Sequence, residues 1–511
     1  MDIWLLILLS LSFATALSLL LHHATKKKRL PPGPPAVPII GNLFWLRRSF
    51  QEVETILREL HAQYGPIVTL HVGSRPAIFI SDRTLAHRAL VEHGATFSDR
   101  TPQLPALRFL GRDHLISAAA YGPLWRLLRR NLISEILHSS RVKVYAHGRA
   151  WVLQVLSNHL RSQAASNDAG AVTAVESFQF AMFCLLVLMC FGEKLDEKAI
   201  KDIEIAQKSL LLYSNKLNVL AFAPRISRYV FRDRINTVLQ MRQRQEELFV
   251  PLIRARKEFK KQQQRQKSEE ERFVYSYVDS LLDIELSEEG GRRLTEREIV
   301  ALCSEFLNAG TDTTSTALQW IMANLVKHQD IQSKLREEIE GAVGSDAQEI
   351  KEEDLQKMPY LKAVIKEGLR RHPPGHFVLP HTVTEDVVLD GYLIPRGASI
   401  NFMVAEMGWD GKVWEEPMEF KPERFLAGGS GEGVDITGSK EIKMMPFGVG
   451  RRICPGIGLA MLHLECFVAN LVKEFEWKPV EGEEVDLSEK PEFTVVMKNP
   501  LRACILPRTK I

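Results

Sequence analysis

The 511-residue sequence has few cysteines, little excess charge and no internal repeat. Its six cysteines, at positions 184, 190, 303, 454, 466 and 504, show neither the paired spacing of a zinc site nor the density of a disulfide scaffold. Cys184, Cys190 and Cys303 lie in apolar runs with helical periodicity. These absences argue against a small disulfide-stapled protein and favour a reduced, cytosol-facing domain.

The net charge of +3 comes entirely from the first 35 residues, where Lys26–Arg29 outweigh Asp2. The remaining 62 basic and 62 acidic residues cancel. Nothing in this balance suggests a nucleic-acid-binding protein. A Gly-rich dinucleotide fingerprint is also missing, so we expect no nicotinamide cofactor to be bound by such a motif.

The N-terminus carries the signature of a membrane anchor. Ile3–Leu21 contain no charged residue, which is enough length to cross a bilayer as a helix. The basic cluster Lys26–Arg29 that follows is expected to stay on the cytoplasmic side. A cleaved signal peptide is the alternative, but the chain starts Met1-Asp2 and lacks a basic first region. The next residues, Leu30–Pro35, are proline-rich and predict a stiff extended spacer.

We therefore divide the chain into an anchor (1–25), a basic and proline-rich hinge (26–35) and one catalytic domain (36–511). The domain is mainly α-helical by periodicity, with a small β-rich part. Two β-hairpins are predicted, at Ile67–Ile80 and at Val387–Pro395, the second with Asp390-Gly391 in a tight turn. Two stretches are interpreted as surface insertions, a Lys/Gln/Glu-rich one at 254–272 and a Gly/Ser-rich, mobile one at 427–440.

The most specific motif lies near the C-terminus and reads Phe-x-x-Gly-x-Arg-x-Cys-x-Gly, with Phe447, Gly450, Arg452, Cys454 and Gly456. A buried structural cysteine is the commonest fate of a lone Cys. However, ordinary residue frequencies would produce these five residues in a chain of this length about once in ten thousand times. The glycines would let the backbone approach a flat macrocycle, and the arginine can bind a carboxylate.

A helix is predicted at Ile457–Phe475, so Cys454 is expected at a helix N-terminus, where N–H groups and the dipole stabilise an anionic sulfur. The motif resembles the haem-binding loop of the cytochrome P450 monooxygenases. The resemblance implies haem b, with Cys454 as the axial thiolate. It also implies that Phe447, Gly450, Arg452 and Gly456 belong to the cofactor-binding loop.

A long helix is predicted from a capping box at Thr295–Glu298 to about Lys327. In its middle, Ala309–Thr314 read Ala-Gly-Thr-Asp-Thr-Thr, a low-relief spot followed by residues that can loosen a helical turn. Alone, this pattern would be explained by packing. With the Cys454 loop it resembles the distal helix of the P450 family, which implies that Asp312 and Thr313 are the catalytic acid and alcohol.

Three further elements follow the family order. Glu367, Arg370 and Arg424 stand in Glu-x-x-Arg and Pro-Glu-Arg-Phe motifs, and the resemblance implies a buried structural triad. Trp125 and Arg129 form Trp-x-x-x-Arg on one helix face and would hold a haem propionate. His381 stands where the family has a residue reaching the other propionate. Arg126, Arg129 and Arg130, with the haem-loop arginines, would form a basic face that suits an acidic reductase.

The resemblance covers essentially the whole chain and is closest to plant A-type microsomal members. It implies a P450 fold and a haem-thiolate monooxygenase that inserts one atom of O2 into an apolar small molecule, such as a plant secondary metabolite or lipid. Electrons would come from NADPH through a separate NADPH-cytochrome P450 reductase, with cytochrome b5 as a further partner. The protein would be single-pass in the endoplasmic reticulum membrane, with its catalytic domain in the cytosol.

Two alternatives remain open from the sequence. A haem-thiolate isomerase or dehydratase would use the same cysteine without O2, but it would have little need of the acid–alcohol pair. A haem carrier or sensor would need neither the long helix nor an apolar pocket. By resemblance, that pocket would draw on mostly apolar segments at 102–110, 306–310, 376–379 and 493–496.

Overall fold

The structure is a computed structural model, and it describes residues 30–36, 42, 50–72, 75–101, 114–167, 170–214, 230–266, 274–344 and 350–508. The expected membrane anchor at 1–25, the basic cluster and the pocket segment 102–110 lie outside the described residues. The chain divides into two compact units, each built from three segments. The first unit comprises 1–101, 377–407 and 435–453, and the second comprises 102–376, 408–434 and 454–511.

The first unit is organised around a four-stranded sheet with the order β1-β2-β9-β6. The predicted first hairpin is confirmed, because β1 and β2 pair antiparallel, with Ile67 opposite Ile80. Strand β9 adds in parallel to β2, and β6 pairs antiparallel with β9. The elements of this unit are α2 (Phe50–Tyr64), β1 (Ile67–Val72), β2 (Arg75–Ile80), α3 (Arg83–His87), β6 (His381–Thr382), β7 (Val387–Leu389), β8 (Tyr392–Ile394), β9 (Ser399–Phe402) and α15 (Val404–Gly408).

The second predicted hairpin is also confirmed, as β7 and β8 pair through a tight turn. Asp390 and Gly391 both have positive φ, 52° and 78°, which is the conformation that a type I′ turn requires. The described part of the proline-rich hinge forms neither helix nor strand, and it is attached to the sheet. Thr69 donates its backbone N–H to the Pro32 carbonyl at 2.8 Å, so the described part of the hinge packs along β1.

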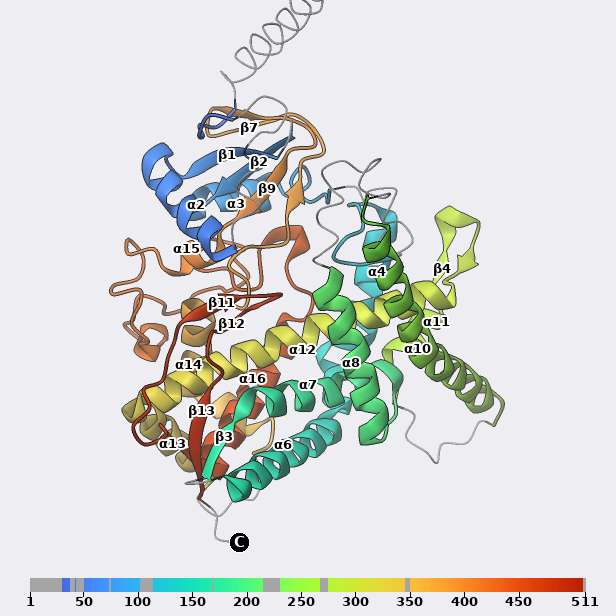
Figure 1. Cartoon of the computed structure of the whole chain (residues 1–511), viewed down its shortest axis with the longest axis vertical. Coiled ribbons are helices and arrows are strands. Elements are labelled where there is room, and N and C mark those ends of the chain that lie inside the picture. The colour runs from blue at the N-terminus through green and yellow to red at the C-terminus, as the bar shows by residue number, and fades with distance from the viewer. Residues whose placement is uncertain are drawn as a thin grey trace, which may run out of the picture. The chain divides into compact units, whose positions relative to one another are not determined.

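The second unit is mainly helical and is built around α12 (Figure 1). Its helices are α4 (Pro123–Leu132), α5 (Ser139–Val144), α6 (Ala146–Ser166), α7 (Ala174–Phe191), α8 (Glu197–Ser214), α10 (Arg232–Gln266), α11 (Tyr277–Leu282), α12 (Glu296–Lys327), α13 (Gln329–Val343), α14 (Pro359–Arg371) and α16 (Ile457–Glu474). Its strands are β3 (Ala171–Thr173), β4 (Glu285–Leu286), β5 (Arg292–Arg293), β10 (Phe475–Lys478), β11 (Glu489–Pro491), β12 (Val495–Met497) and β13 (Arg502–Pro507).

Helix α12 begins where the sequence predicts. Thr295 accepts from the backbone N–H of Glu298, and the Glu298 carboxylate accepts from the N–H of Thr295, which completes the capping box. Helix α7 packs alongside α12 and is apolar apart from Glu176, Ser177 and Gln179 near its start. Within the described residues α7 is the one helix long and apolar enough to span a membrane, yet 83% of it is buried. This burial identifies α7 as a core helix of the second unit.

Candidate active site

Cys454 lies just before α16, whose N-cap residue is Gly456. Burial raises the pKa of the Cys454 thiol, while the Gly456 backbone N–H and the positive charge of Arg129 counteract that rise. Both groups stabilise the thiolate, which is the form that binds a metal. A Cβ atom built on Gly456 would find Cys454 Sγ, at 3.8 Å, as its nearest neighbour. The backbone beside the sulfur is therefore open enough for a flat ligand, and these residues fit a haem.

Trp125 and Arg129 lie one turn apart on α4, as their spacing predicts. The Arg129 guanidinium carbon lies 5.4 Å from the centre of the Trp125 ring. The indole N–H, however, donates to the Ile116 carbonyl at 3.0 Å. Burial lowers the pKa of Arg129 and the neighbouring Cys454 raises it, so each group favours the charged form of the other.

Two arginines of the first unit form a cationic cluster. Arg452 donates to the Ser98 carbonyl at 2.7 Å, and Arg100 donates to the carbonyls of Leu379 and Pro380 at 2.6 and 2.9 Å. Burial, followed by the charge of Arg452, lowers the pKa of Arg100 to about 9. Partly buried guanidinium groups whose charges repel each other suit an anionic ligand such as a propionate. Arg100 has no recognisable motif around it, and the sequence reasoning missed it.

His381, in β6, was predicted to reach a propionate. Its Nδ1–H donates to the Phe97 carbonyl at 2.6 Å, since a carbonyl oxygen can only accept. Burial, followed by the charge of Arg100, lowers the pKa of His381 to about 3. In this geometry the imidazole is neutral and holds β6 to the Phe97 segment, while the positive charge nearby comes from the arginines.

The two glycines of the cysteine motif, Gly450 and Gly456, are required for different physical reasons. Gly450 has a φ of 78°, and a Cβ there would overlap the Leu90 carbonyl oxygen. The sequence interpretation, that Gly450 makes room for a macrocycle, is therefore incomplete, because the backbone of its own unit already requires glycine. Phe447, in the same segment, is half-buried.

Helix α12 is buried on both sides of its midpoint but is open at the predicted oxygen-activating turn. Ala309 is exposed, and Thr313 is partly exposed. The Thr313 hydroxyl donates to the Ala309 carbonyl at 2.6 Å, which leaves its oxygen able to accept a hydrogen bond from water. Gly310 faces the other way, since a Cβ there would lie 2.7 Å from Leu186 Cδ1 of α7. Of the two small residues, Ala309 therefore faces open space and Gly310 packs against α7.

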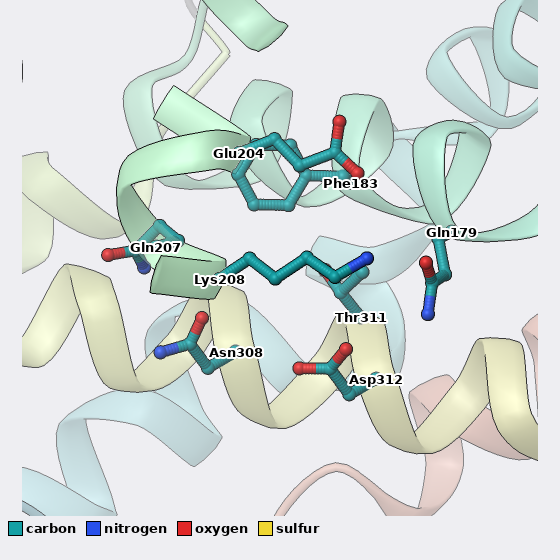
Figure 2. A pocket seen from close by; sticks show the side chains of 8 residues that line it. All are labelled: Gln179, Phe183, Glu204, Gln207, Lys208, Asn308, Thr311 and Asp312. Carbon is teal, nitrogen blue, oxygen red and sulfur yellow. The ribbon is translucent and has the colours of Figure 1, made fainter. Parts of the chain in front are cut away.

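Asp312 points into a small pocket between α7, α8 and α12 (Figure 2). The pocket encloses about 20 Å³, which is room for one water molecule. Figure 2 shows the Lys208 side chain extending over Thr311 and Asp312, with Glu204 on its other side. Within the described residues the buried Thr311 hydroxyl has no hydrogen-bond partner, which further suits a bound water.

Burial raises the pKa of Asp312 to about 6, although the Lys208 charge lowers it in part. A carboxyl with such a pKa exchanges protons readily near neutral pH. Burial also raises the pKa of Glu204. The sequence predicted the acid but not its lysine neighbour, which comes from a helix about one hundred residues earlier.

The structural triad is present in the second unit. Arg370 donates from Nε and a terminal nitrogen to the two carboxylate oxygens of Glu367, at 2.7 and 2.8 Å. Arg424 reaches the same carboxylate at 3.3 Å. Glu367 is fully buried, and the two arginines are 1% and 7% exposed. The three charged groups bind one another in the interior, which supports a structural role.

The sequence from residue 31 to residue 505 matches the family model described as cytochrome P450. The chain belongs to the cytochrome P450 family. It is 50% identical to cytochrome P450 89A9 of Arabidopsis thaliana, over 99% of this chain and 98% of the relative. It is 30% identical to flavonoid 3'-monooxygenase of the same plant, over 98% and 97% of the two chains. It is also 30% identical to isoflavone 2'-hydroxylase of Medicago truncatula, over 95% and 93%.

Family membership establishes the coarse function. The protein is a P450 monooxygenase of plant type with a haem held by a cysteine thiolate. As such it uses O2, a redox partner and a small-molecule substrate. The mainly helical fold with a small β part agrees with the fold predicted from the sequence.

Proposed function

We propose that this P450 oxidises an apolar small molecule, a plant secondary metabolite or lipid, at a pocket beside the middle of α12. The observation that carries the proposal is the local opening of that helix. Ala309 is exposed and Thr313 partly so, although the helix is buried on either side. A core helix that opens at a small residue beside a hydroxyl offers space for O2 and a proton-bearing water.

The haem would be held by a thiolate and by cationic side chains. Cys454 would supply the thiolate that holds the haem iron, and the Gly456 N–H together with Arg129 would stabilise its negative charge. From the family resemblance, Arg129, Arg452 and His381 would serve the propionates, and Arg100 adds positive charge beside Arg452. The Trp125 indole N–H donates to the Ile116 carbonyl, so Trp125 would act through its contact with Arg129. When bound, the haem supplies the binding and activation of O2, for which a thiolate ligand is suited.

Asp312 and Thr313 have different roles in proton delivery. Thr313 fixes a water through its hydroxyl oxygen, because its hydrogen is already donated to the Ala309 carbonyl. Asp312 exchanges protons with a water molecule in the small pocket that Asp312 and Lys208 both line. Its pKa of about 6 allows it both to gain and to release a proton at cytosolic pH.

Electrons come from NADPH through NADPH-cytochrome P450 reductase, and cytochrome b5 serves as a second donor. Arg126 and Arg130 of α4 lie in the same helix as Arg129 and support a basic docking face. The uncharged Ile3–Leu21 segment and the basic residues after it support a single-pass anchor in the endoplasmic reticulum, with the catalytic domain in the cytosol.

Carbon monoxide difference spectra combined with NADPH consumption in the presence of plant reductase test this proposal. A monooxygenase shows the thiolate-type spectrum and consumes NADPH faster when its substrate is added. A haem-thiolate isomerase would show the spectrum without NADPH consumption, and a carrier or sensor would show neither substrate turnover nor consumption. Plant metabolite fractions that produce a substrate-type shift of the haem spectrum then identify the substrate class.

A further inference from the structure

The C-terminal hairpin of β11 and β12 lies against α12 (Figure 1). The Thr494 hydroxyl lies 2.9 Å from the Thr316 hydroxyl, and Thr316 is one helical turn beyond Thr313. The Trp320 indole donates to the Val495 carbonyl at 2.8 Å. The tip of the hairpin is therefore fixed to the same helix that carries the catalytic alcohol.

Phe493 is the apolar residue at this tip. It directly precedes Thr494, and 44% of its surface is exposed. An exposed phenylalanine costs free energy in water unless an apolar partner covers it. Because the adjacent Thr494 contacts Thr316, one turn from Thr313, a bound apolar substrate is a suitable partner for Phe493.

The base of the hairpin is held by one carboxylate shared between two histidines. Glu489 Oε1 lies 3.0 Å from His372 Nδ1, and its Oε2 lies 3.4 Å from His376 Nε2. The histidines are 1% and 3% exposed, and they come from the segment that follows α14. A guanidinium nitrogen of Arg371 lies 3.9 Å from the same carboxylate. On the exposed part of the hairpin, Glu492 instead pairs with Lys490 at 2.7 Å.

The protonation of His372 follows from its surroundings. Its ring stacks on the Trp320 indole, with centres 4.1 Å apart and planes 1° apart. Within the described residues its buried Nε2 has no polar partner, so a proton there would be unsatisfied. The proton therefore sits on Nδ1 and is donated to Glu489, in agreement with burial lowering the pKa of His372 to about 4. The pair is a fixed hydrogen bond rather than an exposed ion pair.

We propose that Glu489 is a positioning residue that sets substrate size selectivity, by clamping the hairpin base to His372 and His376 so that Phe493 stays over the opening of α12. The proposal rests on the proposed function, because it assumes that the opening beside Thr313 receives the substrate. Glu489 touches neither substrate nor cofactor in this account. It acts through the position of Phe493.

Azole ligands of graded size test the clamp in the full-length holoprotein. Imidazole and 4-phenylimidazole both bind haem iron and are followed by spectral titration, and the clamp predicts that only the larger one contacts Phe493. Glu489→Ala is expected to weaken 4-phenylimidazole by about tenfold and imidazole by less than about twofold. Glu492→Ala, which removes a carboxylate from the exposed part of the same hairpin, is the matched control and should change neither affinity.

A double-mutant cycle separates positioning from general damage to the fold. If Glu489 acts through Phe493, Glu489→Ala should lose its effect on 4-phenylimidazole in a Phe493→Ala background. Equal weakening of both azoles, or an undiminished effect in that background, would overturn the clamp. If Glu489→Ala fails to bind haem, Glu489→Gln decides the question. Its amide oxygen still accepts from His372, so the affinity for 4-phenylimidazole should fall only about threefold. A wild-type protein without the thiolate spectrum would instead contradict the proposed function.

Discussion

Replacing Glu367 by glutamine removes the only carboxylate of the buried triad while keeping its shape. Arg370 then loses the counter-charge for two hydrogen bonds, and Arg424 loses the one at 3.3 Å. The backbone N–H of Lys421, which donates to the same carboxylate at 2.8 Å, keeps an acceptor in the amide oxygen. The main loss is therefore electrostatic, because two buried cations remain without their anion.

Removing one partner of a buried ion pair costs about 3–5 kcal/mol. We expect the lower end, about 3 kcal/mol, because Arg370 keeps the carbonyls of Gly408, Pro417 and Glu419 as acceptors. Denaturant unfolding followed by the haem absorbance gives the free energy of unfolding of each variant. Glu340→Gln is the control, since its i,i+4 pair with Arg336 is solvent-exposed and should cost less than about 0.5 kcal/mol. A loss below about 1 kcal/mol for Glu367→Gln would refute the reasoning that the triad is a buried charge network.

Three other changes have defined outcomes. Asp312→Asn should stabilise the protein by about 2 kcal/mol near pH 8 and hardly at all near pH 4, as measured by the free energy of unfolding. Burial raises the pKa of Asp312 from 3.8 to about 6, so the folded wild type loses free energy of unfolding as the pH rises from about 4 to about 6, where the unfolded chain ionises first. Asparagine has no such loss, and the partial exposure of the side chain reduces the difference. An Asp312→Asn effect that does not depend on pH would contradict the burial of this carboxyl. Thr313→Ala should bind haem normally but release more hydrogen peroxide per NADPH consumed, whereas Thr313→Ser should release as little as the wild type. Equal peroxide release by the wild type and both variants would contradict a role of Thr313 in proton delivery. Deleting residues 1–25 should release much of the protein from membranes with the haem spectrum intact, and loss of haem incorporation would argue against an independent anchor.

Local signals in the sequence were sufficient for much of the fold. The capping box at Thr295–Glu298 predicted the start of α12 because both of its hydrogen bonds form between neighbours in the chain. The Asp390-Gly391 turn likewise requires positive φ at two adjacent residues, which few other dipeptides tolerate. Features of this kind depend on a few consecutive residues, so one sequence is enough to find them.

Contacts between distant segments could not be predicted in the same way. Nothing near Gly450 reveals that the Leu90 carbonyl occupies its Cβ position, and nothing near Gly310 reveals Leu186. Arg100 also lacked a signal, because its importance comes from the charge of Arg452, more than three hundred residues later. These relations depend on tertiary packing, which periodicity and motif spacing do not encode.

The candidate site shows the same division. Cys454, Asp312 and Thr313 could be proposed from the sequence because their motifs are short and ordered along the chain. The surroundings that tune them, such as Lys208 beside Asp312, come from other helices and required the structure. The direction of the Trp125 indole, which donates to the Ile116 carbonyl, is likewise set by the segment before α4 rather than by the motif itself.

The reduced carbon monoxide spectrum of the wild type and of Cys454→Ser tests the central claim most directly. The wild type should show the red-shifted absorbance band of a thiolate-ligated haem, and Cys454→Ser should lose it, because a hydroxyl cannot replace the thiolate that Gly456 and Arg129 stabilise. Cys466→Ser provides the matched control, since this buried cysteine lies within α16 and should leave the band unchanged. Persistence of the thiolate band in Cys454→Ser would contradict the assignment of Cys454 as the haem ligand.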